Sequence, residues 1–363
     1  MSSPFNCPIK SLPLIELKGD FFEMGRQYGE QCREQIRELL TIRLTSALSH
    51  AAARGKKFSQ QQALVIAAEN LTKLKLFHPE GYRELLGISE GSNITMAELY
   101  ILQGLTDFRD FLSWGKTPDG LGCTSLIITR ERSHSGQLIL AQNWDLQTSN
   151  MPYVCFVKRK PFHGPQSLSL TIAGGLSMIG LNSEGVAIGT NNIKTKDARQ
   201  GVHYLNLIHK VMTCKSTTES KNLIHNAIRS GAHYFLIGDA NGEYCGLECS
   251  ATHSEEILEK NGIVTHCNHP LHSAIAELSA EDMGPSTCHR QKRVDELSDK
   301  KNFNIESIKN ILSDHKGGDL AICRHDVDEG ISTNASVIIE PEKGVIHACR
   351  SNAHEGIWQS FSF

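Results

Sequence analysis

The residues with the clearest chemical potential lie around a Gly-Cys junction a third of the way along the chain. Cys123 follows Gly122 and opens an apolar, β-branched run, residues 126–129, that predicts a buried strand. A second apolar run, residues 138–142, ends in an Asn-Trp-Asp triplet at 143–145, and a turn-forming Ser-His-Ser-Gly segment separates the two runs. The pattern predicts a hairpin with a thiol at the start of one strand and an amide and a carboxylate at the end of its neighbour.

This junction predicts a nucleophile produced by self-cleavage. If the peptide bond between Gly122 and Cys123 is cut, Cys123 acquires a free α-amino group beside its own thiol. A free α-amine has a pKa of about 7.7–8.0, so part of it is unprotonated near neutral pH and can act as general base. Gly122 suits the cleavage step because a residue without a Cβ tolerates strained backbone angles and leaves room for the thiol to reach the carbonyl carbon.

Two other interpretations of the residues stay open. In a single-chain cysteine hydrolase, His266 would serve as the base for Cys123, since the seventeen histidines offer many partners, although no papain-type signature surrounds the cysteine. The second alternative is a non-catalytic protein of the same fold. The sequence argues against a serine hydrolase of the α/β-hydrolase type, because Thr124 and Ser125 lie in no Gly-x-Ser-x-Gly motif.

Three residues are weaker candidates for a substrate pocket: Thr124, Trp144 and Asn191. Trp144 could line an acyl pocket, although core packing explains a tryptophan at a strand end equally well. Asn191 follows a predicted strand and could orient a substrate amide, although turn chemistry also explains it.

The eleven cysteines are odd in number and mostly lie inside apolar runs, which predicts reduced thiols rather than a disulfide framework. Cys245 and Cys249 have a spacing that could serve a zinc site together with the histidines at 266–272. The two cysteines alternate with apolar residues as in a strand, so we expect core thiols there. We therefore expect no metal site, and the sequence indicates no cofactor.

The composition is that of an ordinary globular protein. Of 363 residues, 39% are hydrophobic and 21% are charged, and the net charge is −3. No basic block with interleaved aromatic residues occurs, which argues against nucleic acid as a partner. The chain opens with neither a basic nor an apolar leader and holds no run of 18 apolar residues, so we expect a cytoplasmic protein that does not bind membranes.

The periodicity predicts a mostly helical first third and a strand-rich remainder. Helices are expected over 21–54, 58–77, 82–86, 96–105, 202–214, 217–230, 286–299 and 305–313. Strands are expected over 154–157, 167–171, 185–189, 234–237, 242–248, 336–339 and 344–347. This order favours an α+β fold with two stacked antiparallel sheets and helices outside.

Four motifs in this order resemble the isopenicillin N acyltransferase family, which are self-cleaving cysteine N-terminal-nucleophile hydrolases. They are Gly122-Cys123-Thr124, Asn143-Trp144-Asp145, Gly180-Leu-Asn-Ser-Glu-Gly185 and His266-Cys-Asn-His269, and the opening segment 15–29 is also similar. The resemblance implies a four-layer αββα sandwich. It also implies a retained helical segment, residues 1–122, and a catalytic segment, residues 123–363, within one integrated domain.

The resemblance assigns roles to four residues. Cys123 matches the nucleophile and Gly122 the residue before the scissile bond. Asp145 matches a carboxylate that supports processing, and Asn268 matches the amide that donates to the oxyanion. Losing one such donor typically costs about 10²–10³ in rate. His269, next to Asn268, is a further pocket candidate.

The chain differs from the family pattern at one place. Where the fungal acyltransferase has a Ser-Arg pair before its late strand, this chain has no arginine in register, and Arg324 lies upstream. We therefore expect hydrolysis of a small non-peptide amide, through an acyl-enzyme on Cys123, rather than penicillin assembly. Acyl transfer from acyl-CoA or an amide donor stays the close alternative. The expected assembly is a self-cleaved heterodimer, with further oligomerisation left open.

Overall fold

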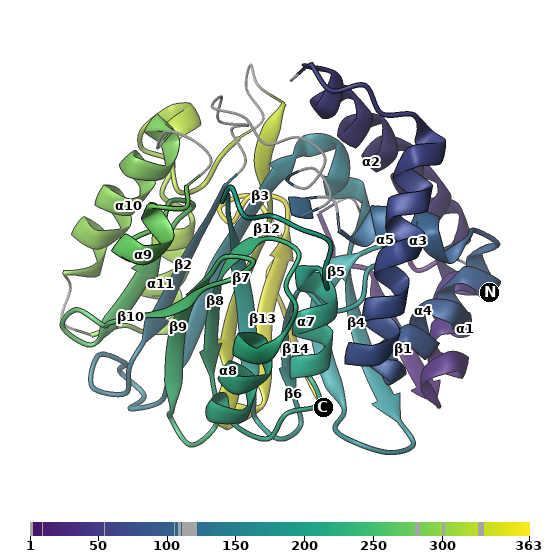
Figure 1. Ribbon diagram of the computed structural model, residues 1–363. Coiled ribbons are helices and arrows are strands. Elements are labelled where there is room, and N and C mark those ends of the chain that lie inside the picture. Colours follow the sequence, from purple (N-terminus) through teal and green to yellow (C-terminus); the bar gives the residue numbers. More distant parts are fainter. Residues whose placement is uncertain are drawn as a thin grey trace.

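The computed structural model describes residues 3–8, 10–53, 55–104, 106–107, 110, 122–279, 284–299, 302–325 and 330–363. Within these residues the strands form two stacked sheets, and helices cover the outer faces (Figure 1). This is the four-layer αββα sandwich that the sequence predicts, and the expected α+β class is confirmed. No helix in the described ranges is long and apolar enough to cross a membrane.

An eight-stranded sheet carries the helical first third of the chain. Its order is β1 (Leu14–Gly19), β4 (Val154–Pro161), β5 (Ser167–Ile172), β6 (Ile179–Asn182), β7 (Ala187–Ile193), β8 (Ala232–Gly238), β9 (Tyr244–Cys249) and β10 (Ser254–Ile257). Strands β1 and β4 pair in parallel, and the other neighbours are antiparallel.

A six-stranded antiparallel sheet carries the Gly-Cys junction. Its order is β11 (Ile263–His266), β2 (Gly122–Ile128), β3 (Ile139–Gln147), β12 (Ile331–Glu340), β13 (Val345–Arg350) and β14 (Gln359–Ser362). The predicted hairpin is confirmed, since β2 and β3 are direct neighbours. Strands β2 and β3 face β7 and β8 of the larger sheet.

The helices divide between the two outer faces. The larger sheet is covered by α1 (Phe21–Gln31), α2 (Arg33–Ala53), α3 (Gln60–Phe77), α4 (Pro79–Ser92), α5 (Met96–Gln103), α7 (Tyr204–Val211) and α8 (Thr217–Asn226), directly or through α1 and α7. The smaller sheet packs against α10 (Pro285–Ser298) and α11 (Ile305–Leu312), while the short α9 (Ser273–Ala276) contacts β10. Three 3₁₀ turns complete the described elements: η1 (Thr148–Tyr153), η2 (Gly318–Leu320) and η3 (Pro341–Lys343).

Helices α1 and α4 cross backbone to backbone through glycines. A Cβ added at Gly25 would lie 2.0 Å from the Glu84 carbonyl oxygen, and one at Gly87 would lie 2.1 Å from the Phe22 carbonyl oxygen. Because residues four apart share one helix face, Gly25 and Gly29 form a flat stripe on α1. This close crossing holds the helical first third against the sheet.

Two helix predictions need correction. The single helix expected over 21–54 is divided at Cys32, because α1 lies flush on α4 whereas α2 continues against α5 and η1. The short helix expected over 82–86 extends over Pro79–Ser92, ending at Asn93 with φ of 56°. Its glycines lower helix propensity in the sequence, but they are the residues that permit the packing on α1.

Candidate active site

The Gly-Cys junction lies at the beginning of β2, in register with the Asn-Trp-Asp triplet in the second half of β3. Gly122 pairs with Asp145, Cys123 with Trp144 and Thr124 with Asn143. The expected register is therefore present, but the Cys123 thiol lies on one face of the hairpin, and the Asn143 amide and the Asp145 carboxylate lie on the other. Residue 121 and the ten before it lie outside the described residues.

The backbone nitrogen of Cys123 is held by Asn268, which follows β11. The Cys123 N–H donates to Asn268 Oδ1 at 2.7 Å. Asn268 is itself fixed, since its N–H donates to Thr287 Oγ1 at 2.8 Å and its Nδ2 donates to the Asn192 carbonyl at 2.9 Å. The strand and its neighbour therefore bring together two residues that lie 145 positions apart in the sequence.

Arg290, on α10, is a site residue that the sequence analysis missed. Its guanidinium donates to the Cys123 carbonyl, to Thr124 Oγ1 at 3.2 Å and to Asn268 Oδ1 at 2.9 Å. The side chain is only 1% exposed. One signal in the sequence could have found it: Arg290 falls on the buried stripe of α10 with Thr287 and Val294, where an arginine is unusual.

Arg290 also explains why residue 122 is a glycine. A Cβ at Gly122 would lie 2.7 Å from Arg290 Nη2 and 3.3 Å from Asp145 Oδ2. Gly122 is not among the described glycines with positive φ, so the strained backbone expected from the sequence is not found. The requirement is instead a close approach of the guanidinium to the main chain.

Asp145 is buried between two arginines. Its Oδ1 accepts a hydrogen bond of 2.7 Å from Thr333 Oγ1, while its buried Oδ2 has no partner among the described residues. Burial raises the pKa of Asp145, and the positive charges of Arg290 and Arg324 oppose that rise.

Arg324 therefore lies closer to the site than its place in the sequence suggests. Its N–H donates to Thr333 Oγ1 at 2.9 Å, and the register between β3 and β12 shifts between Thr333 and Ala335. This irregularity in the strand pairing is a feature that alignment by spacing cannot predict.

The thiol of Cys123 is buried, with only 5% of the residue exposed. Burial raises the pKa of Cys123 to about 12, and the carboxylate of Asp145 adds to the rise. In the uncut chain the thiol is therefore protonated near neutral pH. A base must accept its proton before it can attack a substrate.

The four pocket candidates have different surroundings. Trp144 is 6% exposed and belongs to the same core cluster as Cys123, and Thr124 accepts a hydrogen bond from Arg290. Asn191 Nδ2 donates to Ser125 Oγ and to the carbonyls of His266 and Cys267 at the end of β11, so it braces β7 against β2 and β11. Contact of these residues with a substrate stays a prediction.

His269 lies at the edge of a surface hollow of about 560 Å³ that α10 borders. Its Nδ1 is 2.9 Å from Thr287 Oγ1, the hydroxyl that also accepts from the Asn268 N–H. Burial, with nearby His266 and Arg290, lowers the pKa of His269 to about 4. The imidazole is therefore neutral near pH 7.

His266 is poorly placed to be the base of a Cys-His pair. Its Nδ1 is 2.7 Å from the Cys267 carbonyl, its Nε2 is 2.7 Å from Glu248 Oε1, and its ring stacks on Tyr234. Both ring nitrogens are therefore engaged away from Cys123. Nor do the described residues bring Cys245, Cys249 and the nearby histidines together as a metal-binding group.

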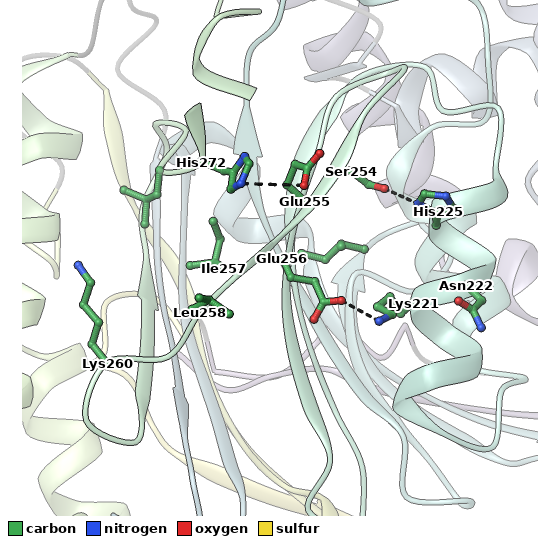
Figure 2. Close-up of a pocket in the computed structure, with 12 residues that line it drawn as sticks. Lys221, Asn222, His225, Ser254, Glu255, Glu256, Ile257, Leu258, Lys260 and His272 are labelled. Carbon is green, nitrogen blue, oxygen red and sulfur yellow. Dashed lines mark hydrogen bonds and ion pairs between the residues drawn. The ribbon is translucent and has the colours of Figure 1, made fainter. Parts of the chain in front are cut away.

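A second hollow, of about 820 Å³, lies beside the edge strand β10 (Figure 2). Its polar side chains pair largely with one another: Lys221 with Glu256 at 2.7 Å, and His225 with Ser254 at 2.6 Å. Such internal pairing is typical of a solvated surface. None of the residues that line this hollow contributes to the constellation around Cys123.

Comparison with known proteins identifies the family. A family model described as acyl-coenzyme A:6-aminopenicillanic acid acyl-transferase matches residues 131–355, a range that includes Asp145 and Asn268 and begins after Cys123. A relative, the acyl-coenzyme A:6-aminopenicillanic-acid-acyltransferase 40 kDa form of Emericella nidulans, is 23% identical over 314 residues, covering 85% of this chain and 84% of the relative.

Solved structures are more distant. A mutant of conjugated bile acid hydrolase from Clostridium perfringens aligns at a TM-score of 0.44 and 12% identity, covering 66% of this chain and 97% of that one. Penicillin V acylase from Agrobacterium tumefaciens aligns at a TM-score of 0.39 and 12% identity, covering 62% of this chain and 82% of that one. Since the family model matches more than half of its length, the chain belongs to the acyl-coenzyme A:6-aminopenicillanic acid acyl-transferase family.

Proposed function

We propose that this protein is a self-cleaving cysteine amidohydrolase that hydrolyses a small non-peptide amide through an acyl-enzyme on Cys123. The observation that carries the proposal is the hydrogen bond from the Cys123 N–H to Asn268, beside the guanidinium of Arg290. Every buried main-chain N–H needs an acceptor, and at this junction the acceptor is a side-chain amide that also contacts an arginine. That nitrogen becomes the α-amine, and hence the general base, once the preceding bond is cut.

In the cleavage step, the Cys123 thiol attacks the carbonyl carbon of Gly122. The Sγ–C bond forms, the C–N bond breaks and the departing nitrogen takes up the proton of the thiol, which leaves a thioester. Water then hydrolyses the thioester, releasing the Gly122 carboxylate and restoring the thiol beside a free amine. Arg290 supports this step, since its guanidinium contacts the main chain on both sides of the bond through Gly122 and the Cys123 carbonyl.

In the catalytic step, the α-amine of Cys123 takes the proton of the thiol and returns it to the leaving amine. Asn268 Nδ2 carries two hydrogens, and the Asn192 carbonyl accepts one of them, which leaves the other to donate to the oxyanion. Asp145 balances the charge of Arg290 and holds it against the main chain. Water then hydrolyses the thioester of the acyl-enzyme, which releases the acyl group as the free acid and restores the Cys123 thiol.

Transfer of the acyl group to an amine is the second candidate function. It is favoured by the activity named for the family and for the relative from Emericella nidulans. The two functions differ in the final acceptor alone. Addition of amine acceptors to the reaction distinguishes them, because a transferase forms a new amide while a hydrolase releases free acid.

The segment before the cut is expected to stay bound after cleavage. Strand β1 pairs with β4 over six residues, and Arg159 Nε donates to Glu84 Oε1 at 2.8 Å with both side chains buried. Burial alone would raise the pKa of Glu84, but Arg159 and His209 lower it to about 2. Separation would break this buried ion pair and the backbone hydrogen bonds between β1 and β4.

The test is denaturing mass spectrometry of the purified protein and of its Cys123→Ala variant. We expect two fragments that meet at Gly122/Cys123 in the parent and one full-length chain in the variant. Cys214→Ala, which removes another buried cysteine, is the matched control and should still yield two fragments. A single full-length chain in the parent, in a preparation that hydrolyses amides, would contradict the self-cleavage and favour a single-chain enzyme.

A further inference from the structure

Three histidines from separate segments meet on the surface beyond α11. His315 follows α11, His325 follows η2 and His354 follows β13. Their rings are close: the centroids of His315 and His354 are 4.9 Å apart, and those of His325 and His354 are 4.8 Å apart. One potential ligand atom from each residue lies within 4.8 Å of the others.

The ring nitrogens of two of them are arranged as in a metal site. His315 Nδ1 lies 3.0 Å from the Ser313 carbonyl, which can only accept, so Nδ1 carries the hydrogen and Nε2 keeps a lone pair. His325 Nε2 is buried and has no hydrogen-bond partner in the part of the chain that the structure describes. A buried nitrogen without a partner is unfavourable unless a ligand reaches it.

We propose that His315, His325 and His354 bind one divalent transition-metal ion of the zinc type. Three neutral imidazoles suit Zn²⁺ and disfavour Mg²⁺, which prefers oxygen ligands. Tetrahedral zinc with bonds of about 2.0–2.1 Å sets its ligand nitrogens about 3.4 Å apart, so the rings must close inward. His315 and His354 are exposed and can rotate to do so.

The surroundings supply the outer contacts of such a site. Glu355 Oε1 lies 3.9 Å from His325 Nδ1, and this carboxylate can accept from that nitrogen once the Asn352 amide, whose Nδ2 now lies 3.5 Å from it, turns aside. A carboxylate or carbonyl that accepts from the second ring nitrogen orients a metal-bound histidine. The fourth coordination position is left for water. Spacing along the chain does not predict this site, because the three histidines share no motif.

Metal binding would also fix a segment that leads to the proposed active site. His325 directly follows Arg324, whose N–H donates to Thr333 Oγ1, the hydroxyl that donates to Asp145. The ion would thus join the segments after α11, η2 and β13 outside the smaller sheet. The proposal rests on the histidines alone and holds whether or not Cys123 is a nucleophile.

The experiment is titration of the untagged full-length protein with Zn²⁺, by calorimetry and by metal analysis after dialysis, with Co²⁺ as a spectroscopic probe of geometry. We expect one ion per chain, a tetrahedral Co²⁺ spectrum and no heat with Mg²⁺. His315→Ala and His354→Ala should each weaken Zn²⁺ binding at least tenfold. His163→Ala, at an exposed histidine between β4 and β5, is the matched control and should leave it unchanged.

Zn²⁺ should also raise the Tm of the parent and not that of the double variant His315→Ala/His354→Ala. Both substituted side chains are exposed, so the variant is expected to fold, and circular dichroism checks this directly. Zinc binding by the double variant equal to that of the parent, or no stoichiometric binding by the parent, would overturn the proposal.

Discussion

The two faces of the β2–β3 hairpin differ sharply in chemistry. The face toward the larger sheet carries Cys123 and Trp144 and continues into the apolar core between the sheets. The face toward α10 carries Asp145 and receives Arg290. Because side chains alternate across a strand, the thiol and the charged groups lie on opposite sides of the same main chain. In the proposed mechanism the charged groups act on the peptide bond before Cys123, and the thiol receives the substrate acyl group on the other face.

The largest expected effect concerns the thiol before and after cleavage. With a pKa of about 12, Cys123 of the uncut chain should be alkylated at pH 8 about 10³-fold more slowly than a thiol of ordinary pKa, and tenfold faster for each pH unit gained. After cleavage, reactivity should instead follow the α-amine and increase near pH 8.

Iodoacetamide labelling of a sample taken during processing, followed by peptide mapping, measures both species together. The exposed Cys288 serves as the internal control for the reagent. Equal labelling of Cys123 in cut and uncut chains would show that burial does not control the reactivity of its thiol.

The second largest effect is expected from removing the guanidinium on the face toward α10. Arg290→Met withdraws donors from the Cys123 carbonyl and Asn268 and leaves Asp145 with less opposing charge. We expect self-cleavage to slow by about 10²–10³, measured as the rate at which full-length chain disappears on a denaturing gel. Arg293→Met, on the same helix but paired with Asp314, is the control. Normal processing of the Arg290 variant would contradict the assignment of this face to the peptide bond.

A smaller effect is expected from filling the space against Gly122. Gly122→Ala would place a Cβ 2.7 Å from Arg290 Nη2, which forces the guanidinium away from the main chain. A displacement near 1 Å should slow processing about 10²-fold. Gly136→Ala, at a turn with φ of 68° where a Cβ meets nothing within 4 Å, controls for the loss of a glycine and for backbone strain away from the site. If the Gly122 variant processes at the parent's rate, the close approach has no role in cleavage.

The smallest effects should separate the two faces. Trp144→Phe, on the core face, should change the preference among acyl groups several-fold and leave processing near the parent's rate.

Thr333→Val, on the other face, removes a hydrogen bond of 2.7 Å to Asp145 and should slow processing by up to about tenfold with acyl preference unchanged. Processing assays and a series of acyl amides of increasing length measure both properties. If Trp144→Phe slowed processing and Thr333→Val changed the acyl preference, the assignment of separate roles to the two faces would be wrong.

Local sequence patterns predict the hairpin and the sheet-bearing part of the fold because each depends on neighbouring residues. The two apolar runs at 126–129 and 138–142, with turn-forming residues between them, were sufficient to place Cys123 opposite the Asn-Trp-Asp triplet. Arg290 could not be placed in this way, because it reaches Cys123 from 167 residues away through the packing of a helix on a sheet. The approach of Arg324 to Asp145 could not be predicted for a related reason, since it depends on a hydrogen bond from the Arg324 main chain to Thr333.

The parallel pairing of β1 with β4 gives the proposed cleavage a lasting consequence. In the uncut chain the two strands are tethered, and the entropy of closing the loop between them is an internal cost of folding. Once the bond before Cys123 is broken, the strands belong to different polypeptides, and their meeting depends on protein concentration. An unfolded precursor would regain its structure at a rate that dilution does not change, whereas the mature protein would recover more slowly the more it is diluted. Self-cleavage would thus be irreversible, and the mature protein would keep its structure only while its two polypeptides stay associated.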